Sequence, residues 1–171
     1  MNNSEHFVID RNSVLWAYLS NDVKGLVFDG ELLLRSIDEV THRISDYSFL
    51  VFPFSKAYEG FLKRLFLDLN LIREDEYYGD EIRIGRVLNP GYVHEHQNVF
   101  EKLCRNTGAD GNNVSLKLWE AWKKGRNQVF HYFPHNYRKL SYDEAIDLIK
   151  GLVSAMEYAV GACNLKTNSL L

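Results

Sequence analysis

The sequence predicts an all-α fold, an antiparallel bundle of four to five helices with an irregular N-terminal segment. Apolar residues recur at spacings of three and four along most of the chain, which is the periodicity of amphipathic helices. The connections between these segments are mostly short, and short connections place consecutive helices side by side and antiparallel. The 171 residues suffice for one domain, so we assign residues 30–171 to a single helical domain and residues 1–29 to an N-terminal arm or short extra elements.

Two helices are expected in the first half of the chain. The first covers residues 31–49, with apolar residues at helical spacing: Leu33, Leu34, Ile37, Val40 and Ile44. The second begins at Pro53, because proline suits the first turn of a helix. It carries a nearly continuous apolar stripe: Phe54, Ala57, Tyr58, Phe61, Leu62, Leu65, Phe66 and Leu69. Upstream, residues 7–9 are a candidate strand and residues 14–19 a candidate helical turn.

A long surface connection is expected at residues 72–93, which are rich in glycine and charged residues. A third helix follows at residues 95–106. The fourth helix is capped by Asn113 or Ser115. It ends within a residue or two of His131, because the ring of Pro134 crowds the carbonyl group of Phe130. It carries the apolar residues Leu116, Trp119, Trp122, Val129 and Phe130.

The fifth helix begins at a capping box formed by Ser141 and Glu144. Its expected inward face consists of Ala145, Ile146, Ile149, Val153, Met156, Val160 and Cys163. Cys104 and Cys163 are far apart and belong to no metal or disulfide motif, so we expect two reduced thiols in a cytoplasmic protein. No apolar run approaches membrane-spanning length, and the first residues lack the plan of a signal peptide. No membrane association is therefore expected.

Positive charge is concentrated in one segment of an otherwise acidic chain. The net charge is −3, which does not by itself indicate a nucleic-acid-binding protein. Residues 114–139, however, carry six cationic side chains against the single carboxylate of Glu120: Lys117, Lys123, Lys124, Arg126, Arg138 and Lys139. This pattern is compatible with an RNA-binding surface and also with an ordinary solvated helix face.

The same segment contains an arginine and a histidine five residues apart, Arg126 and His131. Arginine can hold two phosphate oxygens at once, and histidine transfers protons near neutral pH, so the pair is suited to cleave RNA without a metal. Spacing alone is a weak signal, because the chain has ten arginines and six histidines, and Arg35 with His42 is a second match. Arg35 lies inside a regular expected helix and is interpreted as a surface charge.

Position favours Arg126 and His131, which lie where a helix ends. In an ideal helix their side chains would point about 140° apart, so a frayed helix end or a second copy of the chain is needed to bring both to one phosphate. Asn127 adds an amide donor, and Gly125 leaves room for close approach. Further candidate RNA-binding residues are Lys123, Lys124, Tyr132, His135 and Arg138. The alternative is a polar helix terminus in which His131 interacts with the helix dipole.

The Arg-Asn-x-x-x-His pattern near a helix end in a small all-α protein resembles the signature of the HEPN superfamily, whose catalytic members are metal-independent ribonucleases. Within it, the chain is most similar to the HEPN domain of bacterial RNase LS toxins, which a cognate antitoxin inhibits. The resemblance covers roughly residues 50–163 and rests on residues 53–62 and 125–131. It implies that Arg126 and His131 are catalytic, that Asn127 assists, and that Glu59 is the carboxylate these toxins carry on an earlier helix.

Two features qualify the resemblance. HEPN toxins that are modified by nucleotidyltransferase antitoxins carry a tyrosine two residues after the histidine, whereas this chain has Phe133 there and Tyr132 one step earlier. That mode of regulation is therefore not expected. Glu59 also lies four residues before Lys63, and such a pair is a common stabiliser of helix surfaces. The additional N-terminal domains of the full toxins are not expected here.

The expected function is a metal-independent endoribonuclease toxin that cleaves single-stranded RNA through attack by its 2′-hydroxyl group. One histidine per chain leaves either the acid or the base unfilled, so we expect a homodimer with a composite site, and by resemblance a protein antitoxin. No cofactor is expected, and His94 with His96 lacks further ligands for a metal. The alternatives are a non-catalytic HEPN-like module that binds RNA or a nucleotide or serves in assembly, and a purely structural helical protein.

Overall fold

The computed structural model describes residues 8–37, 44–106, 111–163 and 165. The predicted all-α class is confirmed, because every regular element in these ranges is helical. The α-helices are α1 (Val14–Tyr18), α2 (Asn21–Ser36), α3 (Ser48–Asp68), α4 (Glu74–Tyr78), α5 (Ile84–Val87), α6 (Phe100–Asn106), α7 (Gly111–Trp122) and α8 (Tyr142–Ala162). Short turns of other helical types are η1 (Pro90–Tyr92), η3 (Lys123–Asn127) and η4 (Pro134–Asn136).

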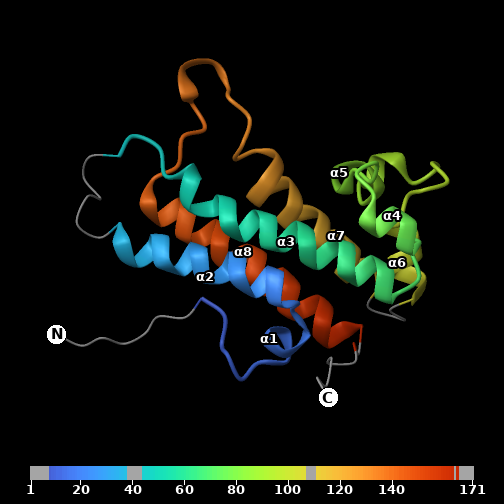
Figure 1. Ribbon diagram of the computed structural model, residues 1–171. Coiled ribbons are helices and arrows are strands. Elements are labelled where there is room, and N and C mark those ends of the chain that lie inside the picture. Colours follow the sequence, from blue (N-terminus) through green and yellow to red (C-terminus); the bar gives the residue numbers. More distant parts are fainter. Residues whose placement is uncertain (1–7, 38–43, 107–110, 164, 166–171) are drawn as a thin grey trace.

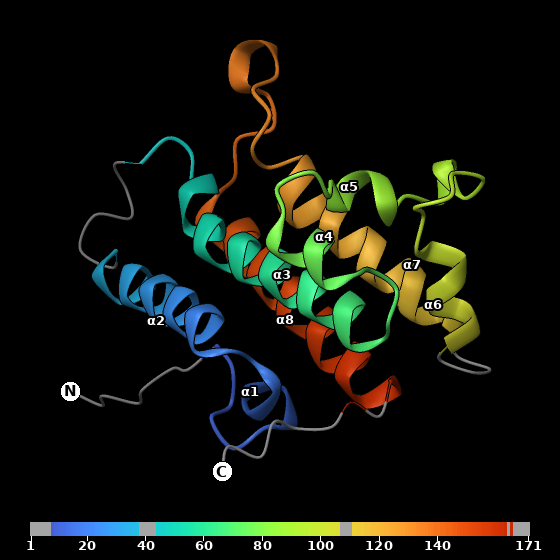
Figure 2. The same ribbon diagram turned by 45° about the vertical axis from the view of Figure 1, so that its right-hand side comes forward.

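The four longest helices lie side by side (Figures 1 and 2). Helix α3 contacts both α2 and α8, and α7 packs against α8 and α6. The short helices α4, α5 and α6 gather near one end of α3 and α7, while the segment between η3 and α8 extends away from the helices. None of the helices in the described ranges is both long enough and apolar enough to cross a membrane.

Helix α3 is the centre of the core, as its apolar stripe predicts. Its fully buried side chains include Phe54, Tyr58, Phe61, Leu62, Leu65 and Phe66. The hydroxyl group of Tyr58 donates a 2.9 Å hydrogen bond to the carbonyl of Leu118, which ties α3 to α7. Gly30 permits the close approach of α2, because a Cβ atom there would lie 2.5 Å from the ring of Phe54.

The predicted first helix, residues 31–49, is wrong in its boundaries. Helix α2 instead begins at Asn21, after Ser20 caps it by accepting a hydrogen bond from the backbone of Val23, and ends at Ser36. Its buried positions are Val23, Val27, Gly30 and Glu31, whereas Leu33 of the expected stripe is 39% exposed. Val40 lies outside the described residues, and Arg35 is exposed as expected.

Pro53 does not begin the second helix. It is the sixth residue of α3, where its missing N–H group leaves one intrahelical hydrogen bond unmade. The helix begins at Ser48 because the carboxylate of Asp46 accepts hydrogen bonds from both the backbone and the hydroxyl group of Ser48. This capping depends on a side chain that the apolar pattern does not reveal.

Two other predicted helix starts and the expected form of one connection differ from the structure. Helix α6 begins only at Phe100, whose N–H group is capped by the side chain of Asn98. Helix α7 begins at Gly111, and Ser115 lies inside it, where its hydroxyl group donates to the carbonyl of Phe100. Residues 72–93 form short helices rather than a simple surface connection, with Ile84, Val87 and Leu88 buried.

Two further predictions are confirmed, and one is not. The candidate helical turn is α1, and the capping box at Ser141 opens α8, whose buried residues include Ala145, Ile149, Val153, Met156 and Val160. Val8 and Ile9 of the candidate strand have no strand structure, and residue 7 lies outside the described part. Cys163 is a free thiol with a pKa that burial raises to about 11, and the side chain of Cys104 is not described.

Candidate active site

The end of α7 widens into the π-helical turn η3, which carries Arg126 and Asn127. The backbone N–H group of Gln128 bonds to the carbonyl of Lys123, five residues back. Such turns insert one extra residue into a helix and are frequent at functional sites. The predicted continuation of regular helix to about His131 is therefore wrong, because α-helical geometry ends at Trp122 and the π turn at Asn127.

Gly125 and Ser55 hold this turn against the core. Gly125 is buried, and a Cβ atom there would lie 2.7 Å from the side chain of Leu152 on α8. The carbonyl of Gly125 accepts a hydrogen bond from the buried hydroxyl group of Ser55 on α3. This bond replaces an intrahelical partner for the carbonyl and fixes the direction in which the next two residues leave the core.

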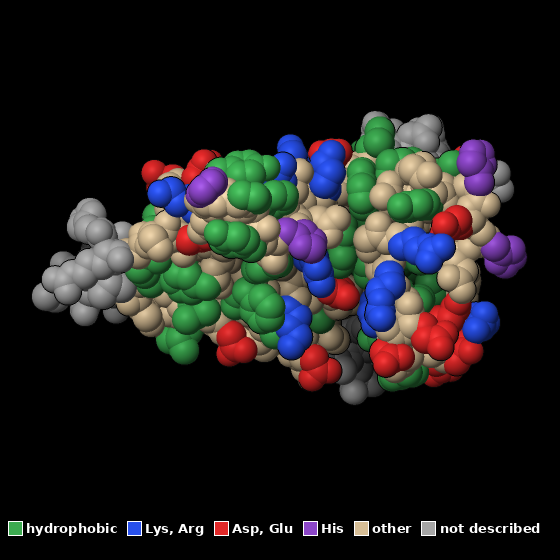
Figure 3. Space-filling view, turned by 90° about the horizontal axis from the view of Figure 1, so that it is seen from above, with side chains coloured by type: hydrophobic (Ala, Val, Ile, Leu, Met, Phe, Trp, Pro, Cys, Tyr) green, Lys and Arg blue, Asp and Glu red, His purple; other side chains and the backbone are tan. Residues whose placement is uncertain are grey.

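A cavity of about 730 Å³ lies beside the turn, and Arg126, Asn127 and Glu59 all line it. Glu59 comes from α3 and is half-buried, while the opposite wall is formed by the segment from Ile82 to Tyr92. The volume is within the range of small-molecule sites, roughly 300–1,000 Å³. Figure 3 views this side of the molecule and shows Lys and Arg side chains on both sides of a hollow.

Three predicted site residues that are far apart in the sequence therefore share one cavity. The guanidinium group of Arg126 lies 5.4 Å from the ring centroid of the buried Trp122, and none of the described carboxylates forms an ion pair with it. Glu59 forms no ion pair with Lys63, so the expected alternative, a Glu–Lys pair that stabilises the surface of the helix, is absent. Arg126 is thus free to contact an anionic ligand.

His131 does not line this cavity. It is exposed and follows Phe130, whose ring meets that of Phe52 edge-on at 5.6 Å. His131 belongs to the segment between η3 and α8, which Figures 1 and 2 show in orange and which projects from the helices. The cavity that Arg126 lines therefore does not include His131 of the same chain.

The remaining predicted RNA-binding residues are dispersed. Tyr132 and His135 are exposed on the projecting segment, and His135 has a left-handed backbone with φ of 60°. Lys123 pairs with Glu120 at 2.7 Å. Lys124 and Arg138 line a different cavity, of about 620 Å³, and the guanidinium group of Arg138 lies 4.1 Å from the ring centroid of Phe133.

Asp46, two residues before α3, is hydrogen-bonded to the projecting segment. Its carboxylate accepts hydrogen bonds from the amide group of Asn136 at 2.9 Å and from the backbone of Leu140 at 3.2 Å. Burial acts to raise the pKa of Asp46, but the hydrogen bonds from Ser48, Asn136 and Leu140 outweigh it and lower the pKa to about 2. The ionised carboxylate is therefore the form that holds the segment.

We expect Asp46→Ala to destabilise the protein by about 1–3 kcal/mol at pH 7, because several hydrogen bonds to a charged group are lost. The folded-state pKa is depressed, so the contribution of Asp46 is fully present above the unfolded pKa of about 4 and is lost as the pH falls through about 2. Urea unfolding at pH 7 and at pH 2.5 measures the free energy of unfolding that the substitution removes at each pH. The control is Asp147→Ala, at an exposed residue. If the parent and the variant differ in their free energy of unfolding by the same amount at both pH values, the anchoring role of the ionised carboxylate is contradicted.

The opposite wall of the cavity contains functional candidates that the sequence pattern did not single out. Arg83, Arg86 and Tyr92 all line the cavity, and all three are exposed. The only available signal was a pair of arginines three residues apart beside Gly85, in a stretch expected to be a surface connection. In the described part of the chain, no three His, Cys, Asp or Glu side chains lie close enough together to hold a metal ion.

Comparisons with models of known families, with curated proteins and with solved structures found no match to this chain. The Arg-Asn-x-x-x-His motif and the residues around the cavity are therefore the observations from which a function is inferred. The lining favours an anionic ligand, because it has three guanidinium groups, of which only that of Arg86 is ion-paired to a described residue, and one carboxylate, that of Glu59.

Proposed function

We propose that this protein is a metal-independent endoribonuclease of the HEPN type that cleaves single-stranded RNA. The observation that carries the proposal is the cavity in which Arg126 and Asn127 of the π-helical turn meet Glu59 of α3. These are the residues that correspond to the HEPN motif, and they come from two helices that are distant in the sequence. A phosphodiester group beside Arg126 would be held by a guanidinium group that has no carboxylate partner among the described residues.

In the proposed reaction the 2′-hydroxyl oxygen of the RNA attacks the adjacent phosphorus. The bond from phosphorus to the 2′-oxygen forms, and the bond to the 5′-oxygen of the next nucleotide breaks. A base takes the proton of the 2′-hydroxyl, and an acid gives a proton to the departing 5′-oxygen. The products are a 2′,3′-cyclic phosphate and a 5′-hydroxyl, and no metal or cofactor takes part.

His131 is proposed to take one of these two proton-transfer roles, with water taking the other, and Arg126 is proposed to stabilise charge that develops on the phosphoryl oxygens. Asn127 adds an amide donor, and Glu59 is proposed to position the imidazole group. Because His131 lies outside the cavity of its own chain, the site is proposed to be completed by a second copy. A symmetric homodimer would then bring the imidazole group of one chain to the Arg126 cavity of the other.

Exposed apolar side chains beside His131 support such a contact. Phe52 is 55% exposed, Phe130 is 36% exposed, and Tyr132 is 79% exposed. Exposed aromatic clusters of this kind are typical of contact surfaces between proteins. The resemblance to HEPN toxins extends the proposal to a cytoplasmic toxin whose activity is controlled by an antitoxin protein.

The second candidate function is a binding module that recognises RNA or a nucleotide without cleaving it. The absence of His131 from the cavity lining favours this alternative, because the cavity alone offers cations and amides but no imidazole group. Arg126 and Asn127 would then supply affinity only. The two functions differ in whether bound RNA is cleaved, and cleavage can be measured directly.

Incubation of the purified protein with labelled single-stranded RNA in a metal chelator distinguishes the two functions. Cleavage that leaves 2′,3′-cyclic phosphate ends, with DNA of the same sequence left intact, is the expected result. RNA that is bound but not cut by a well-folded homodimer would favour the binding module. RNA that is neither bound nor cut would contradict both.

A further inference from the structure

The wall of the cavity opposite Arg126 is formed by a segment that is firmly attached to the core. Ile84, Val87 and Leu88 are buried, and the carbonyl of Val87 accepts a 2.7 Å hydrogen bond from the backbone of Val99. The amide group of Asn98 donates to the carbonyl of Asn89 at 2.9 Å and also to that of Arg86. These bonds hold the exposed side chains of α5 and η1 in a defined position facing the π-helical turn.

Gly85 sets how closely this wall approaches Trp122. A Cβ atom at residue 85 would lie 2.9 Å from the indole nitrogen of Trp122, so only glycine permits the observed distance. Trp122 is 3% exposed, and the centroid of its ring lies 5.4 Å from the guanidinium group of Arg126. The two walls of the cavity are thus connected through one indole ring, with arginines on both sides.

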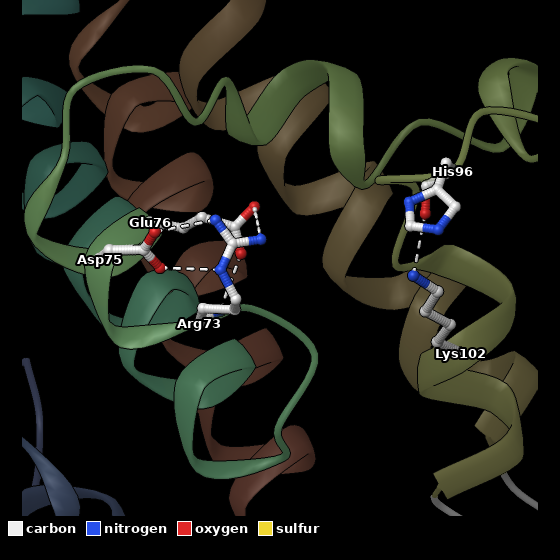
Figure 4. A network of polar contacts seen from close by, with 5 residues as sticks. All are labelled: Arg73, Asp75, Glu76, His96 and Lys102. Carbon is white, nitrogen blue, oxygen red and sulfur yellow. Dashed lines mark hydrogen bonds and ion pairs between the residues drawn. The ribbon is translucent and has the colours of Figure 1, made fainter.

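The arginines of this region differ in how they are neutralised. Figure 4 shows that Arg73 is paired with Asp75 and Glu76, and that Lys102 donates to the carbonyl of His96. Arg86 forms a two-pronged ion pair with Glu95, at 2.7 and 2.9 Å.

Arg83 has no such partner. Its guanidinium group donates to the backbone carbonyl of Asp80, and no described carboxylate lies within ion-pair distance. Arg83 and Arg126 are therefore the two cavity arginines without an ion-pair partner among the described residues, one on each wall.

We infer that Arg83 binds a second phosphate of single-stranded RNA, next to the phosphate held by Arg126. This inference rests on the proposed function and extends it, because it gives the RNA a path across the cavity from the π-helical turn to α5. Two guanidinium groups on opposite walls suit consecutive phosphates of one strand, since each can form two-pronged contacts with phosphate oxygens. Tyr92, 48% exposed on the same wall, offers a flat ring on which a base can stack.

Binding of a fluorescent eight-nucleotide RNA with 2′-O-methyl groups tests this subsite, because such RNA cannot be cleaved by its own 2′-hydroxyl. Fluorescence anisotropy is expected to show about tenfold weaker binding for Arg83→Ala, the loss of one charge-assisted contact. The slope of log affinity against log salt concentration should fall by about 0.7, the value for one phosphate contact on a single strand. Arg35→Ala, at an exposed arginine of α2, is the matched control and should bind as the parent does.

The outcomes separate the subsite from the proposed function. Parent affinity in Arg83→Ala, with weaker binding in Arg126→Ala, would overturn the subsite and leave the ribonuclease proposal standing. Failure of the parent protein to bind RNA would overturn both. A nucleoside 5′-monophosphate that competes as strongly as an unlabelled eight-nucleotide strand would also overturn the inference, because a path across two phosphates requires a longer ligand. Circular dichroism confirms that each variant is folded.

Discussion

Replacing His131 by alanine is expected to lower the rate of RNA cleavage about 10²- to 10⁴-fold, the usual contribution of a general acid or base. The substitution should leave stability within about 0.5 kcal/mol of the parent, because His131 is exposed and makes no hydrogen bond to any described residue. Binding of uncleavable RNA should change far less than cleavage. Single-turnover cleavage and anisotropy, measured on the same preparation, give the two quantities.

His94→Ala provides a matched control for this prediction. His94 is also exposed, but it lies outside the cavity and outside the projecting segment. Its substitution should leave cleavage unchanged. If His131→Ala cuts RNA as fast as His94→Ala does, the imidazole group of His131 is not the acid or base of the reaction, whatever else the protein binds.

Glu31→Ala is expected to destabilise the fold by about 3 kcal/mol, the low end of the range for breaking a buried ion pair. Glu31 is 1% exposed on α2, and its carboxylate binds the guanidinium group of Arg11 and the backbone of Val8. The ion pair of Arg11 with Glu31 joins the residues before α1 to α2. Arg11 also lies 3.8 Å from the ring centroid of Trp16 in α1. The value is at the low end because the side chain of Arg11 is 19% exposed and can reach water when its partner is lost.

Urea unfolding measures this effect directly. Asp29→Ala is the control, since Asp29 lies on the exposed face of the same helix. It should change the free energy of unfolding by no more than about 0.5 kcal/mol. A loss of less than about 1 kcal/mol for Glu31→Ala would contradict a stabilising role for the buried carboxylate.

The parts of the fold that were predictable from the sequence are those in which a long apolar stripe determines burial. The stripes of α3 and α8 identify their core residues because each helix packs against several neighbours, α3 against α2 and α8, and α8 against α1, α3 and α7. The boundary of α3 was not predictable from Pro53, since Asp46 supplies a cap seven residues earlier. The position of α2 was missed because its buried face includes Gly30 and Glu31, which an apolar pattern does not register.

In the candidate site, only the residues that belong to a recognisable sequence motif were predictable. Arg126, Asn127 and Glu59 follow from the sequence pattern and its resemblance, and they do share a cavity. The π-helical turn depends on contacts with Ser55 and Leu152, which no local pattern contains. Arg83 lies in the cavity only because the buried residues of α5 bring a distant segment alongside α7, a contact that a single sequence does not reveal.

His131 is the one predicted catalytic residue that does not line the cavity of its own chain. It follows the end of the π-helical turn. A site divided between two chains is therefore the central claim of the ribonuclease proposal. It requires that the guanidinium group and the imidazole group act together although they belong to different copies.

Mixing two inactive variants, Arg126→Ala and His131→Ala, tests this claim most directly. After subunit exchange, each mixed dimer would contain one site with both groups intact and one site with neither. About a quarter of the parent cleavage activity should return, because half of randomly paired dimers are mixed and each has one working site of two. If the mixture remains as inactive as either variant alone, while mass spectrometry shows that mixed dimers have formed, the divided site is wrong.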